Sequence, residues 1–215
     1  MPTSSVLAIV AHPDDESFGL GAVLDTLVSG GAEGGVLCYT RGEASTLHGV
    51  EGDLTELRVG ELTAAAEKLG LTHVRLCEYP DGDLASIDRT ELAAVAVEQA
   101  RAQRADLVLV LDESGITGHP DHRAATAAGL AAADELGLPV LAWTLSPPIA
   151  DALNAEFPAG FIGTEGDEVW QVSREHQVEA AKAHASQALP TSVLWRRLKL
   201  MGDEEHVRWL RRAAR

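Results

Sequence analysis

An apolar run, VLAIV at residues 6–10, leads directly into AHPDDE at residues 11–16. A second apolar run, LVLVL at residues 107–111, is followed shortly by GHPDH at residues 118–122. Short apolar runs without polar alternation are typical of strands buried on both faces of a parallel sheet. The sequence therefore predicts an α/β fold in which a cluster of histidine and aspartate follows each of two buried strands.

The rest of the chain alternates in the same way. Five apolar runs predict strands, over residues 6–10, 35–39, 73–77, 107–111 and 139–143. Helical patterns separate them, over residues 17–28, 56–69, 88–103 and 122–136. This order predicts a Rossmann-like, doubly wound and mainly parallel sheet with strand order 3-2-1-4-5.

A C-terminal extension follows the fifth strand. Residues 144–160 show no clear period, and residues 161–163 and 168–172 suggest a short hairpin. Two further helices are expected over residues 174–187 and 204–212. With no repeat and no linker, residues 1–215 are expected to form a single domain.

The composition limits the binding partners and the cellular compartment that we expect for the protein. Lys and Arg number 17 against 33 Asp and Glu, a formal net charge of −16, which argues against binding to nucleic acid or to anionic membranes. Two widely spaced cysteines, Cys38 and Cys77, are read as buried thiols in a reducing cytoplasm. No apolar run approaches the about 20 residues of a membrane helix, and the N-terminus lacks a basic secretion signal. Basic residues near the C-terminus are read as a solvated helix face: Arg196, Arg197, Lys199, Arg208, Arg211, Arg212 and Arg215.

The predicted topology brings the two His/Asp clusters together. In a doubly wound sheet, ligands bind outside the carboxyl ends of the strands where the strand order reverses, here between the first and fourth strands. A dinucleotide site would need a Gly-x-Gly-x-x-Gly turn after the first strand, and that turn instead reads HPDDE. We therefore expect one crevice containing both clusters and no dinucleotide.

The residue types in this crevice suit a catalytic metal. His12, Asp15 and His122 offer two imidazoles and one carboxylate, which is typical of catalytic zinc with one open position for water. Asp14 is the candidate general base, and His119, as an imidazolium, is the candidate for stabilising the oxyanion or protonating the leaving amine. Asp121 is expected to orient His119.

These motifs resemble the LmbE/PIG-L family of zinc-dependent de-N-acetylases. Shorter matching pieces include TRGE at 40–43, the Arg-x-x-Glu that starts at Arg58, YPDG at 79–82 and KAHASQ at 182–187. The resemblance implies one zinc ion on His12, Asp15 and His122, Asp14 as the base, and His119 and Asp121 acting on the transition state. It also implies removal of an acyl group, usually acetyl, from an amino sugar or its conjugate.

Substrate contacts are the less specific part of this interpretation. Arg41 and Glu43 are candidate sugar-binding residues, with a surface ion pair as the alternative. His184 is a candidate for reaching the pocket, with a helix-face histidine as the alternative. Residues 112–118 and 144–160 are expected to rim the pocket.

Two other functions remain open from the sequence. A dinuclear phosphoesterase would need more carboxylates at strand ends, for which Asp81, Asp112 and Glu113 are available. A non-catalytic, metal-stabilised binding module would have no use for Asp14 and His119. Iron, manganese and cobalt also suit the ligand set. The aromatic and apolar residues near the C-terminus suggest either a homo-oligomer contact or packing on the chain's own sheet: Trp195, Trp209 and Leu210.

Overall fold

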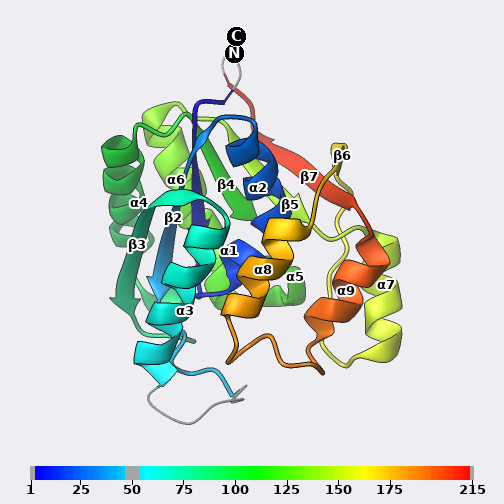
Figure 1. The fold of residues 1–215 in the computed structure, drawn as a ribbon. Coiled ribbons are helices and arrows are strands. Elements are labelled where there is room, and N and C mark those ends of the chain that lie inside the picture. Colours follow the sequence, from blue (N-terminus) through cyan, green and yellow to red (C-terminus); the bar gives the residue numbers. More distant parts are fainter. Residues whose placement is uncertain (1–2, 47–53, 214–215) are drawn as a thin grey trace.

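The computed structural model of the protein describes residues 3–46 and 54–213, and within them one sheet has seven strands (Figure 1). Their spatial order is β3 (Leu71–Tyr79), β2 (Glu33–Thr40), β1 (Ser5–Val10), β4 (Leu107–Leu111), β5 (Val140–Thr144), β7 (Glu204–Arg211) and β6 (Glu168–Gln171). The first five strands pair in parallel, and β7 runs antiparallel to both β5 and β6. The predicted α/β class and the order 3-2-1-4-5 are confirmed.

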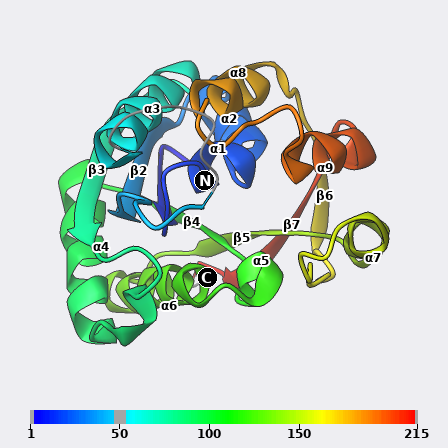
Figure 2. The same cartoon turned by 90° about the horizontal axis from the view of Figure 1, so that it is seen from below.

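Helices cover both faces of the sheet (Figure 2). On one face lie α2 (Gly21–Ser29), α3 (Leu54–Lys68), α8 (Glu175–Ala183) and α9 (Val193–Met201), and α7 (Pro147–Glu156) packs beside α9. On the other face lie α4 (Arg89–Gln103) and α6 (Pro120–Leu136). Three short turns complete the set: α1 (Asp15–Phe18), η1 (Leu84–Ser86) and α5 (Gly115–Gly118).

Strand β1 shows why the central strands read as continuous apolar runs. Val6, Ala8 and Val10 belong to the core on the α2/α3 face, whereas Leu7 and Ile9 belong to the core on the α4/α6 face. All five are at most 1% exposed. A strand between two helical layers needs apolar side chains at every position.

Local signals fix where the helices begin and end. Asp88 caps α4 by accepting a hydrogen bond from the Thr90 amide at 2.7 Å. Pro120 occupies the first turn of α6, and Gly137, with φ 72°, ends that helix in the left-handed conformation.

The C-terminal extension differs from the sequence prediction. Residues 204–212 were expected to be helical, but Glu204–Arg211 form β7. The side chains alternate between the two faces of the strand, since Glu205 and Val207 are buried on one face while Arg208 lies on the other. Residues 161–163 form no strand, 147–156 form helix α7, and helix α9 was not predicted.

Two smaller expectations also change. Cys38 is buried as expected, whereas Cys77 is half-buried on the edge strand β3. Trp209 and Leu210 pack against the two cores of this chain, which was the alternative to a subunit contact. Among the described residues, no helix combines the length and apolar character needed to cross a membrane.

Candidate active site

The strand order reverses at β1, which pairs with β2 on one side and with β4 on the other. The loop after β1 leads into α1, and the loop after β4 leads through α5 into α6. The two loops meet, because the ring centroids of His12 and His122 lie 5.1 Å apart. They form one end of a cavity of about 550 Å³. The predicted meeting of the two clusters is therefore observed.

Three side chains present ligand atoms to one point. His122 Nε2 lies 3.2 Å from His12 Nδ1 and 3.2 Å from Asp15 Oδ1, and His12 Nδ1 lies 3.7 Å from Asp15 Oδ2. In tetrahedral coordination with bonds of about 2.0–2.1 Å, ligand atoms lie about 3.3–3.4 Å apart. One ligand atom from each of the three residues lies within 4.8 Å of the others, and the two shortest distances are close to this spacing, so the residues fit the metal that the sequence predicted.

Surrounding hydrogen bonds orient two members of this metal-ligand group. His122 Nδ1 lies 3.1 Å from the main-chain oxygen of Gly115, which leaves Nε2 as the lone-pair donor. Asp15 Oδ2 accepts hydrogen bonds from the amides of Ala11 and His12, which leaves Oδ1 toward His122. Burial raises the pKa of Asp15, but His122 and His12 lower it by more, so the carboxylate is ionised.

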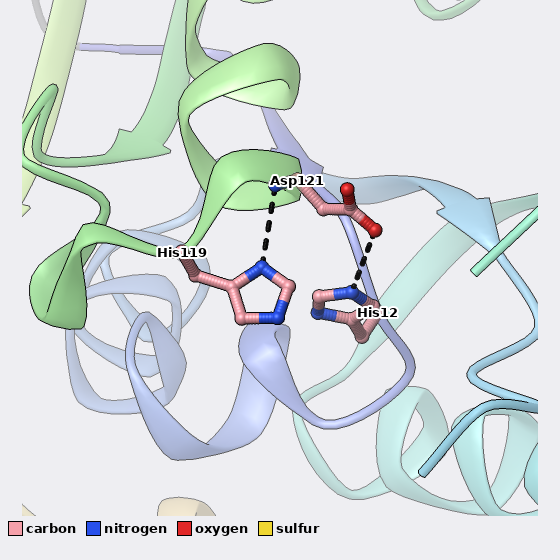
Figure 3. Close-up of side chains that lie close together, drawn as sticks. All are labelled: His12, His119 and Asp121. Atoms are coloured by element: carbon pink, nitrogen blue, oxygen red, sulfur yellow. Dashed lines mark hydrogen bonds and ion pairs between the residues drawn. The ribbon is translucent and has the colours of Figure 1, made fainter. Parts of the chain in front are cut away.

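The opposite nitrogen of His12 contacts two further carboxylates, of which Figure 3 shows Asp121. His12 Nε2 lies 3.1 Å from Asp81 Oδ1 and 3.3 Å from Asp121 Oδ2. Asp121 is fully buried and accepts hydrogen bonds from the amides of Gly82 and Leu84. Burial lowers the pKa of His12, but these carboxylates outweigh it and raise the pKa to about 10. The pair thus fixes His12 with Nδ1 toward His122, as carboxylates do for metal-bound histidines.

His119 and Asp121 are arranged differently from the sequence prediction. The Asp121 carboxylate contacts His12, and only its main-chain amide contacts His119, donating to Nδ1 at 3.2 Å (Figure 3). Because Nδ1 accepts, the proton of a neutral His119 resides on Nε2. Burial lowers the pKa of His119, and the neighbouring His122 and His12 lower it further. The arrangement favours a neutral imidazole with an N–H donor over the expected imidazolium.

Asp14 lines the cavity beside the metal-ligand group. Its backbone has φ 130°, a conformation that non-glycine residues rarely adopt and that clusters at functional sites. The buried Arg58 donates from Nη2 to Asp14 Oδ2 at 2.9 Å and also binds the main-chain oxygens of Pro13 and Gly42. Burial raises the pKa of Asp14 to about 6, against the opposing charge of Arg58.

The three predicted substrate-binding residues lie outside the cavity wall. Arg41 forms an ion pair with the exposed Glu78, which was the alternative interpretation. Glu43 accepts a hydrogen bond from the Asp81 amide at 3.0 Å. His184 is fully buried, with Nε2 2.6 Å from Glu16 Oε1. Each side chain is occupied by a neighbour in the chain, so substrate contact is not supported for any of them.

Other arrangements of the acidic groups are weaker. His12, His119 and Asp121 also bring ligand atoms within 4.8 Å of one another, but the Asp121 oxygens already accept two amide hydrogens. Of the carboxylates considered for a second metal, only Asp81 lines the cavity. Asp112 accepts from Thr164, and Glu113 lies half-exposed near Arg208. A bridged two-metal centre is therefore not formed by the described residues.

Three charged cavity residues were not assigned to the deacetylase site from sequence. Asp81 and Arg58 lie in short motifs that resemble the family, YPDG and Arg-x-x-Glu, so a signal for them was present. Arg197 lies on helix α9 and is buried against the cavity. No signal identified it, because α9 itself was not predicted.

Comparisons with known proteins agree with the motifs. The sequence model of the PIG-L family, GlcNAc-PI de-N-acetylase, matches residues 7–133, more than half of the chain. The chain is 32% identical over 206 residues to 1D-myo-inositol 2-acetamido-2-deoxy-alpha-D-glucopyranoside deacetylase of Mycolicibacterium vanbaalenii, covering 79% of this chain and 70% of that protein. It is 34% identical over 137 residues to diacetylchitobiose deacetylase of Thermococcus kodakarensis, covering 62% and 51%.

Solved structures share the fold. The zinc-inhibited form of teicoplanin deacetylase Orf2 matches with a TM-score of 0.74 and 22% identity, over 96% of this chain and 97% of that one. The chain spans 41%, 70% and 48% of the length of three similar curated relatives, so it is shorter than they are. The family match covers both His/Asp motifs, and the chain belongs to the PIG-L (GlcNAc-PI de-N-acetylase) family.

Proposed function

We propose that the protein is a metal-dependent hydrolase that removes an N-acyl group, expected to be acetyl, from an amino sugar or its conjugate. The observation that carries this proposal is the convergence of His12, Asp15 and His122 beside Asp14 at one end of a cavity. The names of both curated relatives describe deacetylation of an N-acetylated glucosamine unit. An N-acetylglucosamine unit is accordingly the substrate that we propose.

We assign His12, Asp15 and His122 as the ligands of one metal ion, with zinc as the proposed metal. Bound there, zinc would lower the pKa of a water molecule and polarise the amide carbonyl of the substrate. The set of two imidazoles and one carboxylate also suits iron, manganese and cobalt, so the metal is to be identified by measurement.

We propose that Asp14 takes a proton from the attacking water. Arg58 holds Asp14 Oδ2, which leaves Oδ1 to accept the proton. A carboxyl whose pKa is close to neutral both accepts a proton and returns it readily. The same carboxyl can therefore deliver that proton to the leaving amine.

We propose that His119 acts on the carbonyl oxygen of the substrate. Its Nδ1 is held by the Asp121 amide, so Nε2–H is the donor available to the cavity. A fixed donor that meets the developing oxyanion stabilises the transition state more than the ground state. In this proposal a neutral His119 is sufficient.

We further propose that residues 1–215 act as one hydrolytic domain. The family match ends at residue 133, but Phe161, Gln187 and Leu194 also line the cavity. Cytoplasmic location stays a prediction from cysteine usage.

Metal counting together with acetate release tests the proposal. We expect one metal atom per chain in the wild type, little or none in His12→Ala, and acetate release from N-acetylglucosamine glycosides by the metal-loaded wild type alone. Two metal atoms per chain would instead favour the phosphoesterase. No metal after zinc supplementation would mean that these residues do not form a metal site, and bound metal without acetate release would favour the binding module.

A further inference from the structure

Arg197 is a buried arginine that forms no ion pair with any residue that the structure describes. Its side chain lines the cavity from helix α9, and the residue is 8% exposed. The other buried arginine among the described residues, Arg58, is paired with Asp14. No carboxylate of the described residues lies within ion-pair distance of Arg197.

The contacts of Arg197 leave most of its donors without a partner. Nη2 donates to the main-chain oxygen of Phe18, and Nε has no hydrogen-bond partner. The guanidinium carbon lies 5.0 Å from the ring centroid of Trp143, a cation–π contact. Neither contact supplies a negative charge, although burying an unpaired charge is costly.

Glu205 is the carboxylate whose charge acts most strongly on Arg197, but both of its oxygens already have other partners. Glu205 Oε1 lies 2.5 Å from Arg174 Nη1, and Glu205 Oε2 accepts the indole N–H of Trp143 at 2.5 Å. Burial lowers the pKa of Arg197 to about 10, which still leaves the guanidinium charged at neutral pH. Within the part of the chain that the structure describes, Arg197 therefore has no counter-ion.

The surroundings of Arg197 suit an anion. Ser192, Val193 and Leu194, at the start of α9, line the same wall, so the positive end of that helix dipole also faces the cavity. Phe18, Trp143 and Leu194 make this wall largely apolar, which strengthens a charge-assisted hydrogen bond. Asp14, Asp15 and Asp81 line the same cavity and repel an anion, so the field favours a substrate whose anionic end lies at Arg197.

We propose that Arg197 is a specificity residue that binds an anionic group, a carboxylate or a phosphate, on the sugar or aglycone of the substrate. The proposal rests on the deacetylase function above and narrows its substrate class. We place the anionic group on the sugar or aglycone because the acyl group expected to leave is acetyl, and an N-acetyl group carries no ionisable substituent. A guanidinium matches either oxyanion with two parallel hydrogen bonds.

Paired substrates test this proposal. Each pair consists of N-acetylglucosamine carrying a carboxymethyl group at O1, O3 or O6 and the same compound with a neutral carboxamide. The 1- and 6-phosphates form a separate arm that distinguishes phosphate from carboxylate. For each, kcat and KM are measured in metal-loaded wild type, Arg197→Met, Arg197→Lys and Arg196→Met.

We expect wild type to prefer at least one anionic compound over its neutral counterpart by about 10- to 100-fold in kcat/KM, mainly through KM. Arg197→Met should lose this preference, and Arg197→Lys should keep part of it. Arg196→Met is the matched control, because Arg196 is the adjacent residue but pairs with Glu156 outside the cavity. It should keep the full preference. The proposal would be overturned if wild type had the same kcat/KM for the anionic and the neutral member of every pair. It would also be overturned if Arg197→Met kept the preference for the anionic member.

A binding measurement separates this proposal from the proposed function. Calorimetry with the deacetylated anionic and neutral products needs no turnover. If wild type releases no acetate but binds the anionic product at least tenfold more tightly, and Arg197→Met does not, the deacetylase function fails while the anion site stands. If wild type releases acetate but shows no preference for the anionic compounds in rate or binding, the anion site fails while the deacetylase function stands. Thermal unfolding of each variant shows that it is folded.

Discussion

The two walls of the cavity differ in their chemistry. One wall, built by the loops after β1, β3 and β4, carries the titratable groups His12, Asp14, Asp15, Asp81, His119 and His122. We call this the polar wall, and we call Phe18, Trp143, Leu194 and Arg197 the apolar wall, whose single charge is on Arg197. In the proposed function, the first wall holds the metal and moves protons, and the second selects and holds the substrate. Substitutions on the first should therefore change metal content and kcat, and substitutions on the second should change KM and stability.

Asp14→Asn tests the polar wall most severely. Asparagine tolerates the positive φ and still accepts the Arg58 hydrogen bond, but it cannot accept the proton. We expect kcat to fall by about 10²–10⁴-fold, the usual contribution of a general base. Elemental analysis should find the same metal content as in wild type. Turnover at the wild-type rate would remove Asp14 from the role of base.

Glu205→Ala tests the support of the apolar wall. Glu205 is 1% exposed and binds both Arg174 and the indole of Trp143, which lines the cavity. Its removal leaves a half-buried guanidinium unpaired, and breaking such a pair costs about 3–5 kcal/mol. We expect urea denaturation to show a loss of this size. Glu204→Ala, at the exposed neighbouring position, should stay within about 0.5 kcal/mol of wild type. Equal effects of the two substitutions would mean that β7 does not support this wall.

Asp121→Asn tests whether carboxylates behind His12 belong to the metal site. The carboxylate holds His12 Nε2 and lies outside the metal-ligand group. Loss of such an outer partner typically weakens metal binding by 10–100-fold. We expect a chelator competition assay to show about this loss in metal affinity. The matched variant Asp81→Asn, with Asp121 intact, should show a smaller loss, since Asp81 is partly solvated and Asp121 is fully buried. Unchanged affinity in both would assign these carboxylates to folding alone.

The polar wall could be predicted from sequence, and the apolar wall could not. His12, Asp15 and His122 follow buried strands, and the reversal of strand order alone brings them together. Their motifs, AHPDDE at residues 11–16 and GHPDH at residues 118–122, are each one short unbroken stretch of sequence. The meeting of these three residues followed from topology.

The apolar wall depends on packing between distant segments. EEHVRWLR at residues 204–211 has a charge pattern that suits an exposed helix, and only pairing with β5 and β6 makes it a strand. Arg197 looked like one of seven surface charges until α9 placed it over Trp143. The orientation of Asp121 toward His12 also depended on Gly82 and Leu84, which arrive from another strand end. Side-chain direction of this kind is set by tertiary contacts that no local pattern encodes.

Arg41→Ala is the substitution with the smallest expected effect, and it tests where the cavity ends. Arg41 was a candidate sugar-binding residue, but its guanidinium pairs with Glu78 at the surface, where such pairs contribute about 0–1 kcal/mol. We expect KM and kcat within about twofold of wild type and a small change in stability. Arg197→Met, which removes the same charge from inside the cavity, should alter KM for anionic substrates far more. If Arg41→Ala instead raises KM by tenfold or more while stability is unchanged, the substrate extends beyond the two walls and recognition is shared with the loop after β2.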